Sequence, residues 1–206
     1  MGLKQPALRA YSLEIDELAA LVGFLNAKKL VGLDESLFRA FSEENLPRLV
    51  AKLNEHGWLR PAERPGTYHF NEDLMQALAV AVAPQLAVMA RSLAQKKSIV
   101  FYLADDAITE IVVTDDRAVV ASIDGLDEMV GQVMELLGGA WPGEIAVARV
   151  KGEQLDAGRR ATLDASGALS SKTPGLLPAE KNAWSPENVA AFIRGAMADL
   201  RAGANG

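Results

Sequence analysis

The chain of 206 residues is half hydrophobic, contains no cysteine and carries a formal net charge of −6. This length and composition suffice to bury a substantial core, in one large domain or in two small ones that pack closely. The missing cysteines exclude disulfides, thiolate nucleophiles and cysteine-based metal sites, and they suit a reducing cytoplasm. The acidic excess lies in residues 71–140, which carry 4 basic and 11 acidic residues, so this region repels nucleic acid and favours a basic partner.

Targeting signals are not visible in the sequence. Acidic residues at Glu14, Asp16 and Glu17 interrupt the N-terminal region where a signal peptide needs its apolar core. The longest apolar run, 77–90, is broken at Pro84 and is shorter than the roughly 20 residues of a membrane span. We therefore expect a cytoplasmic protein.

Residues 1–97 are expected to form a helical, winged-helix-like region. Its pattern is three helices followed by a β-hairpin, and the first and third helices are marked by a capping residue and an apolar stripe. The expected segments are a helix capped by Ser12, a short helix over 34–41, a helix capped by Ser42 and ended by Gly57, and a hairpin of 58–60 with 67–70. A further helix capped by Asn71 is expected to continue beyond Pro84 towards Gln95.

Residues 98–206 are expected to form an antiparallel sheet with helices. Three runs rich in Ile, Val, Phe and Tyr are separated by acidic turn residues, which predicts a β-meander, and an amphipathic helix follows over 126–137. The irregular stretch 152–184 is expected to be mostly loop with degenerate strands, and Ser185 with Pro186 opens a final helix. The strands are expected at 98–103, 107–113, 118–123, 144–150, around 161–163 and at Leu169. The predicted fold class is α+β, with both regions packed as one domain.

Residues for catalysis are hard to find in this sequence. The two histidines, His56 at a helix end and His69 in the hairpin, are both interpreted as structural. The aspartates at 105–106 and 115–116 fall at opposite ends of a meander, roughly 20 Å apart, so turn formation explains them better than one metal ion. Asp124 is interpreted as the cap of the next helix. We therefore predict no catalytic, cofactor-binding or metal-binding residue, and a protein that is not an enzyme.

Four apolar residues near the irregular stretch are candidates for binding a protein partner. They are Trp141, Leu176, Leu177 and Trp184. Aromatic and leucine residues on loops either anchor the loop to the core or form an interaction surface, and both interpretations stay open.

DNA binding is the alternative that the winged-helix pattern raises. The third helix of such a unit enters the major groove and needs cationic donors. Here that helix carries Arg48 and Lys52 against three glutamates, while Arg60 and Arg64 lie in the hairpin. A winged-helix regulator with an α/β sensor region therefore remains the second hypothesis.

The order of the segments resembles the EspG family, the cytoplasmic chaperones of type VII (ESX) secretion systems. The similarity lies in the segments Leu13-Glu14-Ile15-Asp16-Glu17-Leu18, Leu53-Asn54-Glu55-His56-Gly57-Trp58-Leu59, Asn71-Glu72-Asp73-Leu74, Ala77-Leu78, the meander, Glu135-Leu136-Leu137, Trp141-Pro142-Gly143-Glu144-Ile145-Ala146-Val147 and the last helix.

The resemblance implies an α/β fold with quasi-twofold symmetry in which each half is a sheet backed by helices. The meander with 126–137 forms one half, and the strands of 144–169 with the last helix form the other. Members of the family recognise a helical secreted dimer and keep it soluble without nucleotide or metal. The function implied for this chain is a non-enzymatic chaperone or adaptor.

Overall fold

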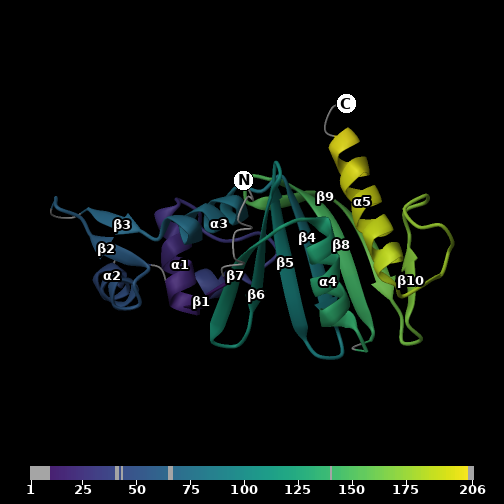
Figure 1. Ribbon diagram of the computed structural model, residues 1–206, viewed down its shortest axis with the longest axis horizontal. Helices are drawn as coiled ribbons and strands as arrows, with labels where there is room; N and C mark the ends of the chain where they lie inside the picture. Colours follow the sequence, from purple (N-terminus) through teal and green to yellow (C-terminus); the bar gives the residue numbers. More distant parts are fainter. Residues whose placement is uncertain (1–9, 40–41, 43, 65–66, 140, 204–206) are drawn as a thin grey trace, which may run out of the picture.

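The computed structural model describes residues 10–39, 42, 44–64, 67–139 and 141–203. The chain has an α+β fold in which one large antiparallel sheet is covered by helices on both faces (Figure 1). The helices are α1 (Ile15–Phe24), the 3-10 helix η1 (Glu35–Phe38), α2 (Leu46–Glu55), α3 (Glu72–Val82), α4 (Leu126–Leu137) and α5 (Pro186–Ala202). The strands are β1 (Ala10–Glu14), β2 (Leu59–Pro61), β3 (Tyr68–Phe70), β4 (Leu86–Ser92), β5 (Lys97–Ala104), β6 (Ala107–Val113), β7 (Arg117–Ile123), β8 (Gly143–Lys151), β9 (Gln154–Leu163), β10 (Ala168–Ser171) and β11 (Asn182–Ala183).

The large sheet has nine strands in the order β1-β7-β6-β5-β4-β8-β9-β10-β11. From the central β4–β8 pair, successive strands add outwards on both sides, and each series is completed by a helix, α4 for one half and α5 for the other. Because β4 and β8 are antiparallel, with Met89 opposite Ala146, the two halves run in opposite directions. This is the quasi-twofold arrangement that the resemblance implied.

Two hydrophobic cores lie on opposite faces of this sheet. Alternate residues of a strand point to opposite faces, so in β5 Val100 and Tyr102 belong to one core and Ile99 and Phe101 to the other. The first core packs against α1, α2 and α3, and the second packs against α4 and α5. The hairpin β2–β3 forms a separate small sheet beside α2.

Several predicted elements are confirmed where local signals are strong. The meander strands β5, β6 and β7 and helix α4 lie where the sequence predicts them. The Asn71 side chain caps α3 by accepting from Leu74 N at 3.0 Å, and Ser185 Oγ caps α5 by accepting from Asn188 N at 3.3 Å. The hairpin of β2 and β3 is also present.

The helix expected to continue towards Gln95 is wrong. Residues Leu86–Ser92 form β4, a strand at the centre of the sheet. Leu86 and Val88 are buried in one core and Ala87 in the other. A strand buried on both faces has a continuous apolar run, which periodicity does not distinguish from a buried helix.

Three predicted caps are also wrong. Ser12 lies inside β1, and the cap of α1 is Glu14, in a capping box with Glu17. Helix α2 begins after Asn45 rather than Ser42, with Pro47 in its first turn, where a missing N–H costs nothing. Gly125 rather than Asp124 precedes α4. In each case a second polar or glycine residue nearby competes for the same role.

The stretch 152–184 contains more strand than expected. The strand expected around 161–163 is the end of a longer strand, β9, which pairs along β8 from Gln154 onward, and the one at Leu169 is part of β10. Since β1 and β4 also join the large sheet, that sheet contains strands from both sides of residue 98.

Candidate binding surfaces

Trp141 and Trp184 line one open hollow of about 510 Å³. Trp141 follows α4 and Trp184 precedes the cap of α5, and both half-buried rings pack against the second core. The remaining lining residues are Ser166, Gly167, Ala168, Lys181, Asn182 and Ala183. Two of the four candidates from the sequence are thus neighbours in the fold.

The turn between β9 and β10 shapes one side of this hollow. Asp164 Oδ1 accepts hydrogen bonds from Ser166 N at 2.8 Å, Ser166 Oγ at 2.6 Å and Ala168 N at 3.1 Å. These hydrogen bonds lower the pKa of the Asp164 carboxyl. Gly167 has a φ of +80°, and a Cβ there would lie 2.5 Å from the Trp141 ring. Trp141 therefore depends on a glycine at this position.

Leu176 and Leu177 lie outside the residues that line this hollow. Leu176 is 9% exposed and packs on α5, where a Cβ on Gly195 would lie 3.4 Å from its Cδ2. Leu177 is partly buried against the same core. In this fold the two leucines hold the loop of residues 172–181 against α5.

A second hollow, of about 260 Å³, lies on the face of β8 and β9 opposite α5. Small residues form its floor, since Ala148 pairs with Gly158 across the two strands. Met89, Leu155 and Arg160 contribute to its lining, and Leu155 is 45% exposed. No pattern used above pointed to this surface, although Ala146 and Ala148 are small residues at alternate positions of one strand and therefore face one way.

The helix that a winged-helix protein inserts into DNA has its cations paired within the protein. Lys52 Nζ lies 2.7 Å from both Glu14 Oε2 and Asp16 Oδ1. Arg48 Nη2 lies 3.4 Å from Asp16 Oδ2. Burial is the largest single influence on the Asp16 carboxyl and raises its pKa, but the contacts with Lys52 and Arg48 together outweigh burial, so the pKa is lowered. Both cations that the DNA hypothesis needs on this helix are therefore paired with acids of β1 and α1, while Arg60 and Arg64, the hairpin cations of the same hypothesis, are exposed.

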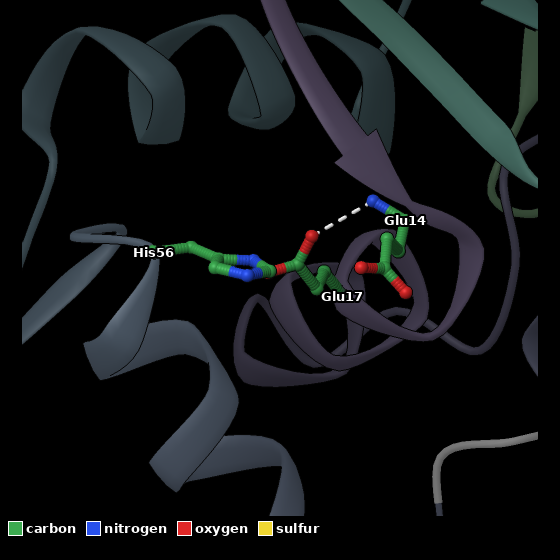
Figure 2. Close-up of side chains that lie close together, drawn as sticks. All are labelled: Glu14, Glu17 and His56. Atoms are coloured by element: carbon green, nitrogen blue, oxygen red, sulfur yellow. Dashed lines mark hydrogen bonds and ion pairs between the residues drawn. The ribbon is translucent and has the colours of Figure 1, made fainter.

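Glu14, Glu17 and His56 form the one group of three potential metal ligands among the described residues (Figure 2). Glu17 is 1% exposed; its Oε2 accepts from Glu14 N at 2.7 Å and its Oε1 lies 2.6 Å from His56 Nδ1. Glu14 Oε2 is in turn paired with Lys52. Protein donors already occupy these oxygens, and the ammonium repels a cation, so the group ties α2 to α1.

His56 thus has a role that the sequence did not reveal. It stands at the end of α2, as expected, but its ring also contacts a buried carboxylate 39 residues earlier in the chain. His69 lies exposed on β3.

The described part of the chain contains no helix that is both long and apolar enough to span a membrane. No family model and no curated protein sequence matches the chain.

Among solved structures, the chain is similar to the type VII secretion system chaperone EspG5 of Mycobacterium tuberculosis, in its complex with the PE25–PPE41 dimer. The similarity has a TM-score of 0.60 at 11% sequence identity and covers 92% of this chain and 96% of that chain. At this identity the likeness establishes an EspG-like fold.

Proposed function

We propose that this protein is a non-enzymatic cytoplasmic chaperone or adaptor of a type VII (ESX) secretion system that binds a helical secreted protein. The observation that carries the proposal is the likeness to EspG5 over nearly the whole of both chains. The partner would be a helical protein or dimer, and the similar EspG5 is found in complex with the PE25–PPE41 dimer. The quasi-twofold sheet supports the same assignment.

The face of β8 and β9 opposite α5, on which no helix of the described chain packs, is the surface we assign to the partner. Ala146, Ala148 and Gly158 allow a helix backbone to approach the sheet closely, and Leu155 offers an exposed apolar side chain beside them. Exposed apolar surface of this kind, with a polar rim, is typical of protein interfaces. Arg160 supplies part of that rim and lies 3.5 Å from Glu144. We propose Trp141 and Trp184 as additional contacts from the adjoining loops.

The test is co-expression with the small helical secreted proteins encoded beside the gene, followed by size-exclusion chromatography. We expect one of them to co-elute with the chain. The variant Gly158→Arg should abolish co-elution, because Gly158 is exposed, a Cβ there makes only ordinary contacts, and the arginine fills the hollow. Ala198→Arg is the matched control, since Ala198 is an exposed residue of α5, on the other face of the sheet from this hollow.

The DNA-binding hypothesis is tested with the same protein. Because Arg48 and Lys52 are paired with acids, we expect no retarded migration of a DNA fragment at physiological salt. Retarded migration together with the absence of any co-eluting protein would refute the chaperone proposal.

A further inference from the structure

The helix layer that covers one face of the sheet ends before the sheet does. Helices α5 and α4 lie side by side on this face, and α4 packs on β4 and β5 (Figure 1). Beyond α4, the same face of β6, β7 and β1 carries no helix of the described chain (Figure 1). Adjacent strands are about 4.8 Å apart, so these three strands offer a width close to the 10–12 Å of one helix.

The outward residues of this bare face are partly apolar. Val112 of β6 is half-buried and Val119 of β7 is 36% exposed. Ala121 lies beside them and is 7% exposed. An apolar strip on a bare sheet face is the counterpart that an amphipathic helix needs.

Glu110 is a nearly buried acid on this face, and contacts within the described chain do not explain why it is there. Its side chain points to the α4 side of β6, between Phe101 of β5 and Ala121 of β7, and the residue is 9% exposed. No cation and no hydrogen-bond donor pairs with its carboxyl among the described residues. Burying such a group without a partner costs free energy.

Two further acids face Glu110 from α4. Burial raises the pKa of the Glu110 carboxyl, and the charges of Glu128 and Glu135 raise it further. Neither of these glutamates forms an ion pair in the described structure; Glu128 Oε2 accepts a hydrogen bond from Asp124 N at 2.7 Å. Among the described strand residues of this face, the cations Lys97 of β5 and Arg117 of β7 each lie four residues along the strand from the residue paired with Glu110, and the Arg117 guanidinium donates to Ser12. The strip beside α4 is therefore rimmed by uncompensated negative charge.

We propose that the surface formed by Glu110, Val112, Val119, Glu128 and Glu135 binds a basic amphipathic helix of a protein partner, with a lysine or arginine of that helix paired to Glu110. The helix continues the α5–α4 layer, packs its apolar face on the two valines and brings its cations to the three carboxylates. An ion pair with a nearly buried carboxylate is stronger than one at the open surface. This site lies on the opposite face of the sheet from the hollow of Ala148 and Gly158, so it does not depend on the function proposed above.

The test uses the full chain and a fluorescein-labelled helical peptide of about five turns, with leucines on one face and arginines on both flanks. A second peptide carries glutamates in place of the arginines. Fluorescence anisotropy should show binding of the arginine peptide only. Glu110→Gln should weaken it about tenfold, the equivalent of about 1.4 kcal/mol, and Val119→Asp should abolish it. Glu180→Gln, which removes one exposed charge from the loop before β11, is the control and should leave binding unchanged.

Three outcomes overturn the proposal. Equal weakening by Glu110→Gln and Glu180→Gln shows that only the net charge attracts the peptide. Unchanged binding by Val119→Asp places the peptide elsewhere. If the arginine peptide binds only to a chain that lacks residues 2–9, which include Lys4 and Arg9, the chain's own N-terminal residues are the natural occupant of the surface. Gly158→Arg leaves this peptide bound while it abolishes co-elution of the secreted protein, so the failure of either proposal is recognisable alone.

Discussion

Replacing Glu17 with alanine is expected to lower the free energy of unfolding by about 2–3 kcal/mol. The capping-box hydrogen bond from Glu14 N, at 2.7 Å, contributes about 1 kcal/mol. The contact with His56 Nδ1, at 2.6 Å, contributes about 0.5–1 kcal/mol because the imidazole side chain is 38% exposed and partly screened by water. Loss of the buried methylene, in a residue only 1% exposed, adds about 0.8 kcal/mol.

Urea denaturation followed by circular dichroism measures this loss. Glu17→Gln is the matched variant, since its amide keeps the shape and both hydrogen-bonding positions, and it should cost about 1 kcal/mol. A double-mutant cycle with His56→Ala should give a coupling of about 0.5–1 kcal/mol. Two results would contradict these roles of Glu17: a smaller loss of stability for Glu17→Ala than for Glu17→Gln, or effects of Glu17→Ala and His56→Ala that simply add.

Three further predictions concern single side chains. Glu110→Gln should stabilise the protein at neutral pH and have no effect below the ordinary carboxyl pKa. The pKa of Glu110 is raised in the folded state, so its destabilising effect develops as the pH rises from the ordinary carboxyl pKa through the raised one. Thermal melts across pH 3–8 measure this, and a variant that is less stable than the parent at neutral pH would show that the carboxyl is paired. Tyr102→Phe should lower the free energy of unfolding by about 1–2 kcal/mol, because the Val31 carbonyl, which accepts from the phenol at 2.8 Å, loses its donor. A change below about 0.3 kcal/mol in urea denaturation would contradict this. Gly167→Ala should lower the free energy of unfolding by about 1–3 kcal/mol more than Gly175→Ala does. Both glycines have φ near +80°, but only a Cβ at Gly167 meets the Trp141 ring. Equal denaturation midpoints and unchanged tryptophan fluorescence would show that the ring moves freely aside.

The parts of the fold that the sequence predicts correctly are those with local signals. Asn71 and Ser185 are the polar residues that cap α3 and α5, and the apolar stripe of α4 repeats at helical spacing between residues 126 and 137. The meander is delimited by its acidic turns. Such signals act over four or five residues and need no knowledge of the rest of the chain.

The central strand β4 shows where these signals end. Its residues are apolar on both faces because each face lies against a core: Leu86 and Val88 belong to the core under α4, and Ala87 belongs to the core on the other face. A run of this kind fits a helix as well as a strand. The cap of α1 was misplaced for a related reason, because pairing with β7 holds Ser12 in an extended strand.

The sequence by itself determined the fold class, the acidic character of residues 71–140 and the candidate tryptophans. Only the tertiary structure placed Trp141 beside Trp184, joined Glu17 to His56 and buried Glu110 between β5 and β7. Capping, turn formation and periodicity arise between near neighbours, and the sequence displays them directly. The proposed binding surfaces lie where strands far apart in the sequence pair and where the helix layers end, so they exist only once the sheet has assembled.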